Sequence, residues 1–371
     1  MLFAPHPDDE SLACGLVIQR AVAAGAAVRV VYVTDGENNP WPQRVLERKW
    51  RLNAEDRKQW GKLRRVEALA ALNVLGVRSS NARFLALPDQ GLTTLLIHDC
   101  RFTLDRLAAI IRDWSPTHLL IPSVADLHPD HSALAVILRL VLAKFFRDEA
   151  QMSVWRYMVH LKNPISFERA QQDLQSERET KIKLRAIHCH KTQLKLSRRR
   201  FLAYARRPER LFRLGSREAT ISDSSIRSIS RQPHTLHVDL RLSMKSIHYA
   251  GPLVFLLGHD ATETLRCITM ELPVRSCNIE MRAVGSEQPA GAAQYRRNGS
   301  GAMFTIPIDL FSPGHSLFIK LERRSWFFDE AGWLEIPVTT DQRNELHNVR
   351  ARATAWSAHR TTAAHRVRML G

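Results

Sequence analysis

Two short motifs rich in histidine and aspartate constrain this chain more than any other feature. The first, Pro-His-Pro-Asp-Asp-Glu, occupies residues 5–10, and the second, Asp-Leu-His-Pro-Asp-His, occupies residues 126–131. Residues 1–4 form a short apolar run, and the apolar spacing over residues 11–24 is typical of an amphipathic helix. The first motif is therefore predicted on a strand-to-helix loop, which is where open parallel α/β sheets bind ligands.

The second motif has the same surroundings. It follows an apolar run at residues 118–122, which predicts a strand, and it precedes a helical pattern at residues 132–146. Further strands are expected at residues 27–34, 82–87 and 154–161, with helices at 64–75 and 104–114 between them. This alternation predicts an α/β fold with a Rossmann-like, mostly parallel sheet flanked by helices.

The pattern changes after residue 215. Residues 216–233 are rich in serine and polar residues, which is typical of a linker. Seven short apolar runs then follow between residues 237 and 338, separated by turn signals and without a long helix, which predicts a smaller, sandwich-like all-β domain over residues 234–340. Residues 341–371 are polar and basic, and predict a disordered tail. The sequence does not indicate the role of the β domain.

Composition limits the partners. The chain of 371 residues has a net charge of +17, which favours an acidic partner such as a phosphate-bearing ligand, nucleic acid or an anionic membrane surface. The five scattered cysteines form no CxxC pair, so we expect reduced residues and a cytoplasmic protein. No apolar stretch has the length of a membrane span.

The residue types in the two motifs suit metal chemistry. A histidine and a carboxylate three residues apart, joined by a distant histidine, can supply an open three-ligand site with a position left for water. The adjacent carboxylates Asp8 and Asp9 point in different directions, so one can bind metal while the other faces the water as a general base. His128 could donate to a developing oxyanion, and Asp130 could fix a histidine tautomer, although Asp130 could also be a helix cap.

Several motifs together resemble the LmbE-like, or PIG-L, family of zinc-dependent N-acetylglucosaminyl deacetylases. The two motifs above are the specific part of this resemblance, which covers residues 1–215. Weaker matches are TDGE at residues 34–37, the pair Arg64 and Glu67, LPDQG at residues 87–91, and the late HKTQ at residues 190–193.

The resemblance implies a zinc ion held by His6, Asp9 and His131, with iron as an alternative ion. It implies that Asp8 is the general base, and that a zinc-bound water removes an acetyl group from an N-acetylated amino sugar. His128 would stabilise the oxyanion, and Arg64 and Asp89 match positions that contact sugar hydroxyls.

The substrate is left open by the sequence. The positive charge favours a phosphate-bearing or lipid-linked sugar, because arginine side chains bind phosphate oxygens in pairs. Peripheral contact with an anionic membrane is compatible with the charge, and the oligomeric state is not indicated. All chemistry-bearing residues lie before Gln193 in the chain, so we expect the β domain to supply none of them.

Two alternatives remain. One is a basic nucleic-acid-binding protein, suggested by the tryptophans set among arginine and lysine in residues 41–65, although no recognised nucleic-acid-binding pattern is visible. The other is an inactive member of the family that binds glycans. The tryptophan-rich segment, residues 38–63, predicts a solvated helix whose tryptophans pack on the body, and the alternative is a basic lid over an acidic or sugar-bearing substrate.

Overall fold

The computed structural model of the chain describes residues 1–146, 152–160, 175–215, 225–241, 253–299, 301–322, 324–325, 328–329 and 331–338. They belong to two compact units. The first comprises Met1–Ser224 and Arg323–Trp333, and the second comprises Ser225–Glu322 and Leu334–Gly371. The predicted tail at 341–371 and the first half of the predicted linker, residues 216–224, lie outside the described residues.

The first unit is built on a six-stranded sheet with the order β3-β2-β1-β4-β5-β6. All neighbouring pairs are parallel except the last, β5 with β6. The predicted mixed α/β fold with a mainly parallel sheet is therefore confirmed. Its strands are β1 (Leu2–Ala4), β2 (Val30–Thr34), β3 (Ala82–Leu87), β4 (His118–Pro122), β5 (Ser153–Tyr157) and β6 (Leu211–Arg213).

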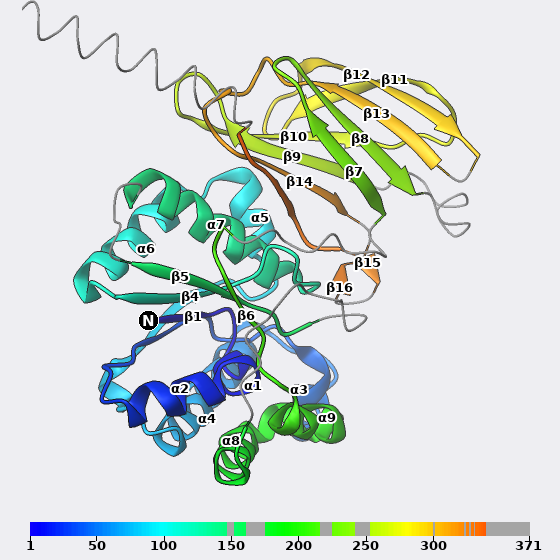
Figure 1. Cartoon of the computed structure of the whole chain (residues 1–371). Coiled ribbons are helices and arrows are strands. Elements are labelled where there is room, and N and C mark those ends of the chain that lie inside the picture. Colours follow the sequence, from blue (N-terminus) through cyan, green and yellow to red (C-terminus); the bar gives the residue numbers. More distant parts are fainter. Residues whose placement is uncertain are drawn as a thin grey trace, which may run out of the picture. The chain divides into compact units, whose positions relative to one another are not determined.

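Helices cover both faces of this sheet. Figure 1 shows α5, α6 and α7 on one face and α1, α2, α4 and α8 on the other. The helix predicted at residues 11–24 is broken at Cys14 into two helices, and residues 38–63 contain the separate α3 and the start of α4. The helices are α1 (Asp9–Ala13), α2 (Gly15–Ala23), α3 (Pro40–Glu47), α4 (Ala54–Val74), α5 (Leu92–His98), α6 (Arg101–Trp114), α7 (Pro129–Phe145), α8 (Glu177–Cys189) and α9 (Lys191–Ala203). Among the described residues, none of these helices combines the length and the apolar character needed to cross a bilayer.

The order of the strands places the two motifs side by side. The chain runs from β1 outward to β2 and β3, and then returns to add β4 on the other side of β1. Because β1 and β4 are parallel neighbours, the loops that follow them leave the same edge of the sheet. These loops begin at Pro5 and Ser123, so residues 5–10 and 126–131 meet at the point where the strand order reverses.

The second unit contains a nine-stranded antiparallel sheet with the order β17-β14-β9-β10-β11-β12-β13-β8-β7. Hydrogen bonding is continuous from one edge to the other, so this is one sheet and not the two separate sheets of a sandwich. A single apolar cluster, which includes Val238, Leu256 and Phe304, forms its core. The strands are β7 (Ile226–Arg231), β8 (Thr235–Arg241), β9 (Leu253–His259), β10 (Leu265–Glu271), β11 (Cys277–Ala283), β12 (Pro289–Asn298), β13 (Gly301–Pro307), β14 (Leu317–Glu322) and β17 (Leu334–Ile336).

Two of these strands were not expected from the sequence. Strand β7 lies inside the stretch predicted as a linker, where alternating serine and arginine on the outer face conceals the inward residues Ile226 and Ile229. Strand β12 lacks apolar alternation, because most of its residues are exposed.

One segment late in the chain belongs with the first unit. Arg323–Trp333 leaves the second sheet after β14 and contains the short pair β15 (Arg324–Ser325) and β16 (Phe328–Asp329) before the chain returns to the second unit at Leu334. Figure 1 labels this pair. The predicted domain boundary at residues 234–340 does not hold for this segment, because it packs against the loop before α7: Asp329 N donates to Leu127 O at 2.9 Å.

Candidate active site

The loop after β1 is held in an unusual conformation. Asp8 has a φ angle of 147°, which L-residues rarely adopt and which commonly marks a functional position. Both the backbone N–H and the hydroxyl of Thr34 donate to Pro5 O at 2.9 Å, and Asp8 N donates to the carboxylate of Glu10 at 3.0 Å. These contacts fix the loop on which His6 and Asp9 stand.

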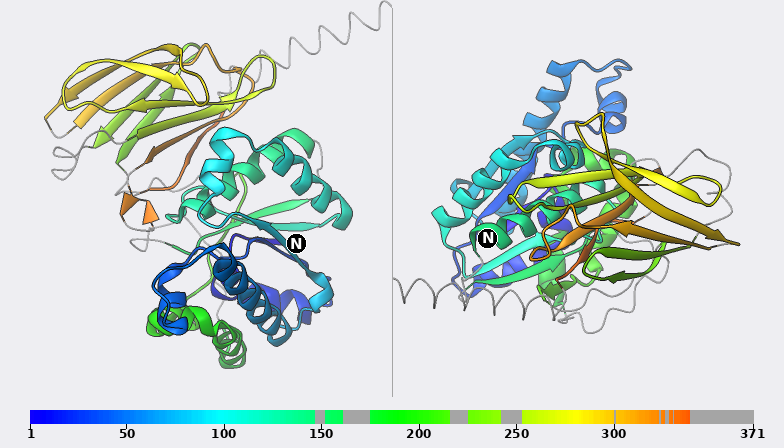
Figure 2. Two further views of the ribbon diagram at one scale, coloured as in Figure 1. Left: turned by 180° about the vertical axis from the view of Figure 1, so that it is seen from behind. Right: turned by 90° about the horizontal axis from the view of Figure 1, so that it is seen from above.

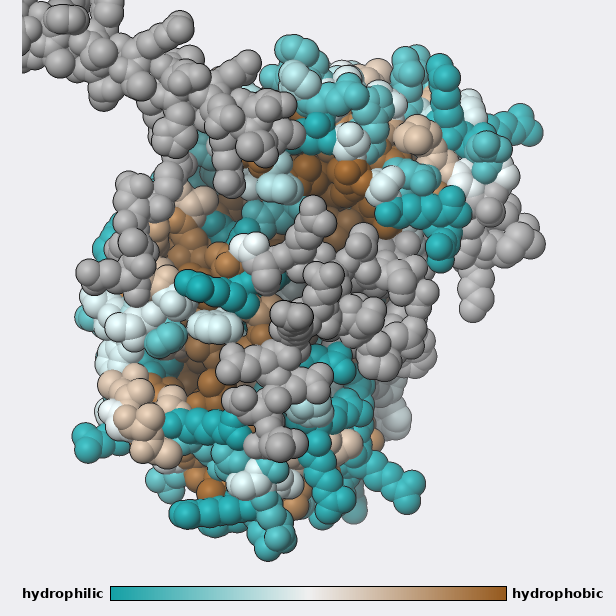
Figure 3. All heavy atoms as spheres, viewed as in Figure 1, coloured by the Kyte–Doolittle hydropathy of each residue, from teal (hydrophilic) through white to brown (hydrophobic). Residues whose placement is uncertain are grey.

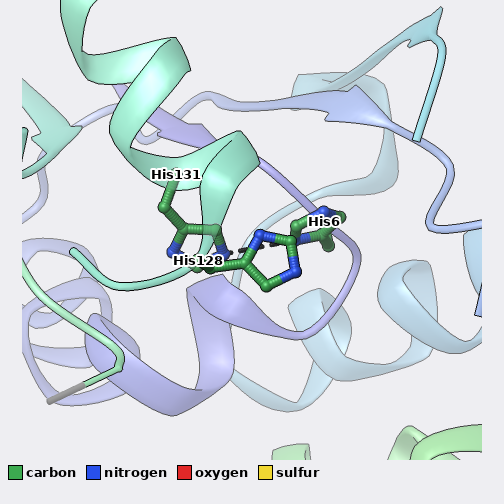
Figure 4. A group of neighbouring side chains, drawn as sticks. All are labelled: His6, His128 and His131. Atoms are coloured by element: carbon green, nitrogen blue, oxygen red, sulfur yellow. Dashed lines mark hydrogen bonds between the residues drawn. The ribbon is translucent and has the colours of Figure 1, made fainter. Parts of the chain in front are cut away.

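Three potential ligand atoms converge between the two motifs. His6 Nδ1 lies 3.2 Å from His131 Nε2 and 3.4 Å from Asp9 Oδ2, and His131 Nε2 lies 3.2 Å from Asp9 Oδ2. Figure 4 shows His6 from the loop after β1 and His131 from the first turn of α7, with His128 beside them. The side chains of His6, Asp9 and His131 are buried. The structure therefore brings together the three residues predicted to hold metal.

This triangle has the dimensions of a metal site. Ligand atoms about 2.0–2.1 Å from a tetrahedral ion are separated from one another by about 3.3 Å. The three observed separations, 3.2, 3.2 and 3.4 Å, match that value. Two imidazole nitrogens and one carboxylate oxygen are also a donor set that suits zinc, and iron accepts the same set. The residues therefore fit the ion that the sequence led us to expect.

Carboxylates orient the two imidazoles from behind. Asp126 Oδ2 lies 3.3 Å from His131 Nδ1, the ring nitrogen that faces away from the converging atoms. On the other side, His6 Nε2 lies 3.1 Å from Asp89 Oδ1 and 3.3 Å from Asp130 Oδ2. Such carboxylate–histidine pairs fix the tautomer and the direction of metal-binding rings. Asp130, which was predicted to fix a histidine tautomer, contacts His6. The carboxylate that contacts His131 is that of Asp126.

The electrostatics of the cluster favour positive charge. Burial by itself lowers the pKa of His131, but the carboxylates of Asp9 and Asp126 outweigh it and raise that pKa to about 9. Burial likewise disfavours a charged His6, yet hydrogen bonds to Asp130, Asp89 and Asp9 raise its pKa well above the usual value. Without a cation, the two imidazoles would have to carry the compensating protons.

Asp8 differs from Asp9 in its surroundings. Burial is the main cause that raises the pKa of Asp8 to about 6, against the opposing effect of Arg64. Burial also acts on Asp9, but His131 and His6 hold its pKa well below the usual value. Asp8 Oδ2 contacts Arg64 Nη2 at 3.0 Å. The two neighbouring carboxylates therefore have separate partners, one at the histidines and the other at an arginine.

His128 is held as a neutral imidazole with a defined tautomer. Burial, and then the neighbouring His6, His131 and His160, lower the pKa of His128 well below its usual value. The backbone N–H of Asp130 donates to His128 Nδ1 at 3.2 Å, which leaves the proton of the neutral ring on Nε2. His128 can therefore donate a hydrogen bond from Nε2.

The predicted substrate-binding residues have other partners. Arg64 is buried and donates to Gly36 O and Pro7 O, both at 2.7 Å, in addition to Asp8. Asp89 accepts from Asn38 N at 2.7 Å and contacts His6. Both side chains also border the cavity, and their contact with a sugar stays a prediction.

The weaker motifs support the site from outside. All four residues of TDGE form hydrogen bonds with neighbouring segments. Thr34 donates to Pro5 O, Asp35 accepts from Arg65, Gly36 O accepts from Arg64, and Glu37 accepts from Asp89 N. The late HKTQ motif is tied to the same network, because His190 Nε2 lies 3.0 Å from Glu10 Oε1 and Thr192 donates its N–H and hydroxyl to Glu67.

His160 is a site residue that the sequence analysis missed. It follows β5, and its ring centroid lies 5.0 Å from that of His131. Burial is the main cause that lowers the pKa of His160 to about 4, and its Nδ1 lies 3.3 Å from Arg200 Nη2. The only signal in the sequence was the position of His160 just after a predicted strand, near the end of the sheet where the two motifs lie. A single histidine after a strand, without a motif around it, does not by itself predict a site residue.

A cavity of about 260 Å³ opens beside these residues. Trp41 and Asn39 of the tryptophan-rich segment border it, so the expectation that its tryptophans pack on the body holds for the buried Trp60 but not for Trp41 or for Trp50, which is 77% exposed. In Figure 2, α3 and the start of α4 (blue) extend from the rest of the first unit. The cavity is bordered by His6, Asp8, Asp9, Leu12, Asn39, Trp41, Pro42, Arg64, Asp89, Gln90, His128, His160, Gln193, Leu196, Ser197, Arg200, Phe201, Tyr204 and Phe328.

Comparison with known families agrees with this geometry. Residues 1–142, which include both motifs, match the model of the PIG-L family, described as GlcNAc-PI de-N-acetylase. Residues 1–142 form a PIG-L domain. The match ends within α7, so β5, the helices α8 and α9, and the second unit lie beyond it.

Curated relatives match the same part of the chain. A 1D-myo-inositol 2-acetamido-2-deoxy-alpha-D-glucopyranoside deacetylase from Mycobacterium avium (strain 104) is 36% identical over 140 residues. The protein of that name from Mycobacterium bovis (strain BCG / Pasteur 1173P2) is 34% identical over 140 residues. In both cases the match covers 34% of this chain and 45% of the relative, so the PIG-L domain is shared and the remainder is not compared.

Solved structures show a more distant likeness. N,N'-diacetylchitobiose deacetylase from Pyrococcus horikoshii has a TM-score of 0.43 at 19% identity, covering 57% of this chain and 82% of that one. A deacetylase triple mutant of the teicoplanin biosynthetic pathway has a TM-score of 0.43 at 19% identity, and the match covers 58% of this chain and 98% of that one. GalB, a 4-carboxy-2-hydroxymuconate hydratase from Pseudomonas putida KT2440, has a TM-score of 0.42 at 20% identity, and the match covers 59% of this chain and 97% of that one.

Proposed function

We propose that the first unit is a metal-dependent hydrolase that removes the acetyl group from an N-acetylated amino sugar. The observation that carries this proposal is the triangle of His6 Nδ1, Asp9 Oδ2 and His131 Nε2, with separations of 3.2–3.4 Å, beside a carboxylate and a neutral imidazole that do not belong to it. A hydrolytic metal site needs this combination of open coordination, a base and an oxyanion donor.

His6, Asp9 and His131 would hold the ion, and zinc is the best fit to their geometry. When bound, zinc would supply Lewis acidity, which polarises an amide carbonyl and makes a water molecule more acidic. Asp126 contacts His131 and Asp130 contacts His6, so these carboxylates would orient the two imidazoles toward a bound ion, and the hydrogen bonds of Thr34 to Pro5 hold the loop that carries His6.

Asp8 is the candidate general base. It takes the proton of the attacking water on its carboxylate and returns it to the departing amine nitrogen, so that the amide C–N bond breaks and acetate and a free amine are formed. Arg64 holds this carboxylate at 3.0 Å and keeps it separate from Asp9. Asp8 itself has the unusual φ angle of 147°, a backbone conformation that is commonly found at functional positions.

His128 is the candidate oxyanion donor. Its Nδ1 is occupied by the backbone N–H of Asp130, so the Nε2 proton is available to the carbonyl oxygen as negative charge develops there. Because the ring is neutral, it can donate this hydrogen bond without adding a second cation to the site.

The similarity to the curated relatives and the basic residues of α9 support a proposal for the substrate class. The curated relatives are named as deacetylases of a 2-acetamido-2-deoxy-glucopyranoside, and we infer that this chain acts on a similar amino sugar. Figure 3 shows hydrophilic side chains gathered over the end of the first unit that carries α8. The exposed residues Lys195, Arg198 and Arg199 of the adjacent α9 favour a phosphate-bearing or lipid-linked form of that sugar. A cytoplasmic location stays a prediction.

Acetate release tests this function. Metal-loaded protein should release acetate from at least one member of a panel containing N-acetylglucosamine, its inositol conjugate, nucleotide-linked and lipid-linked forms. His131→Ala should lose both the ion, by elemental analysis, and the activity. His98→Ala is the control, because that exposed histidine on α5 does not border the cavity. Equal ion content in wild type and His131→Ala would reject the ligand assignment.

A further inference from the structure

Phe328, far along the chain from the PIG-L domain, borders the catalytic cavity. Its ring centroid lies 4.9 Å from that of His160 and 5.9 Å from that of His128. The guanidinium carbon of Arg200 lies 5.4 Å from the centroid of the Phe328 ring on another side. The aromatic ring is thus next to the candidate oxyanion donor.

The position of Phe328 is fixed by the residues that follow it. Asp329 N donates to Leu127 O at 2.9 Å, and Trp333 is completely buried. Gly332 packs so closely that a Cβ atom there would lie 2.2 Å from Val124 O. Asp329 and Gly332 therefore rest on the loop that leads from β4 to His128, and the neighbouring Phe328 keeps its place relative to that loop.

The depth of the cavity indicates which part of the substrate Phe328 meets. The reacting carbonyl must lie between the triangle of ligand atoms and His128, where Asp8, Asp9 and Leu12 are buried. This deep end can take the small acyl group, whereas the larger sugar must extend toward solvent. Phe328 is partly exposed and adjoins the exposed Arg200, so it stands on the solvent side of His128.

We propose that Phe328 determines substrate specificity by packing its ring against the sugar of the N-acetylated substrate, and so completes the pocket. The inference rests on the proposed deacetylase function. Binding pockets combine aromatic walls with a few polar groups that fix orientation, and here Arg200 and His160 are polar groups next to the ring.

The experiment uses the full-length, metal-loaded protein and the N-acetyl sugar that wild type hydrolyses. Phe328→Ala should raise KM about tenfold, because a lost aromatic contact is worth roughly that factor, and should change kcat by less than about threefold. Phe328→Tyr, which keeps the ring, should stay close to wild type. Phe102→Ala is the matched control, because Phe102 is 86% exposed and does not border the cavity.

A second measurement separates a binding role from a packing role. The affinity for the amine product, measured by calorimetry, should fall by the same factor as KM rises in Phe328→Ala. Selectivity between N-acetyl and N-propionyl forms of the sugar should stay unchanged. If Phe328→Ala does not fold, Phe328→Leu is measured in the same way, since it keeps an apolar side chain without the aromatic face.

The outcomes are distinct. An unchanged KM and product affinity in a folded, metal-loaded Phe328 variant would overturn the inference, and so would a change confined to acyl selectivity, which would place the ring at the acyl group. The absence of acetate release by wild type from every sugar would instead reject the proposed function.

Discussion

Asp126 lies behind His131, with its Oδ2 atom 3.3 Å from His131 Nδ1. The same oxygen accepts the backbone N–H groups of Val159, at 2.8 Å, and His160, at 3.2 Å. One carboxylate therefore links the loop after β4 to the loop after β5 and orients a ligand of the candidate metal site. Asp130 and Asp89 have the corresponding place behind His6.

Asp126→Asn should weaken metal binding without abolishing it. The amide keeps the size of the side chain but removes the charge that holds the Nδ1 proton of His131, and losses of this kind typically cost about 10–100-fold in metal affinity. Competition with a chelator measures the affinity. Asp113→Asn, at a carboxylate on α6 paired with Arg29, is the control. An affinity equal to that of wild type would show that Asp126 does not orient His131.

Asp8 and Asp9 should respond differently to the same substitution. Asp8→Asn should retain the metal and lose about 10²–10⁴-fold in kcat, because a positioned general base contributes that much. Asp9→Asn should lose metal, because its Oδ2 atom is one corner of the triangle of ligand atoms. Elemental analysis and acetate release on both proteins check this. Identical behaviour of the two variants would contradict the division of roles.

Gly332→Ala should reproduce part of the Phe328→Ala effect. The added methyl group would lie 2.2 Å from Val124 O and 2.7 Å from Asp126 O, so the segment must shift and carry Phe328 with it. We expect a rise in KM for the sugar with metal content retained. Gly301→Ala measures the effect of the same substitution in β13 of the second unit, where the nearest atoms lie 3.5 Å from the added carbon, an ordinary van der Waals contact. A KM unchanged in Gly332→Ala would argue that Phe328 keeps its place without this close packing.

Glu179 should stabilise the fold in a pH-dependent way. The hydrogen bond from Arg20 and the capping contacts at Ser176 lower the pKa of Glu179 to about 2. The ionised carboxylate is therefore favoured in the folded state. Its stabilisation is fully present above the ordinary pKa of about 4.5 and is lost as the pH falls toward 2.

Urea unfolding of wild type and Glu179→Gln should accordingly differ by about 1 kcal/mol at about pH 6, and the difference should shrink as the pH falls below about 4.5. Glu177→Gln, on the same helix, is the control, because the Glu177 side chain is 83% exposed. A difference that does not depend on pH would show that the charge of Glu179 is not the cause.

The sequence was a good guide to the parts of the site that local patterns encode. His6 lies in the loop after β1, His131 lies at the start of the helix that follows β4, and the parallel arrangement of β1 and β4 follows from the strand–helix alternation around them. The mainly parallel sheet was predicted for that reason, whereas its Rossmann-like detail and the catalytic roles of Asp8 and His128 stay predictions.

Contacts between distant residues were harder to predict. Arg64 and Asp89 matched positions that bind sugars, but their partners in the fold are Asp8 and His6. Which carboxylate stands behind which histidine depends on the turn between Asp126 and Asp130, not on their order in the sequence. Phe328 carries no local signal at all, because a single phenylalanine in a strand of two residues has no motif around it.

Phe328, which borders the cavity, is synthesised late in translation of the chain. The PIG-L domain leaves the ribosome first, and the three residues of the triangle of ligand atoms all lie within it. The wall next to His128, however, cannot be in place until translation has passed Trp333, after most of the second sheet has been made. A nascent or prematurely terminated chain could therefore hold an ion without having a finished sugar pocket.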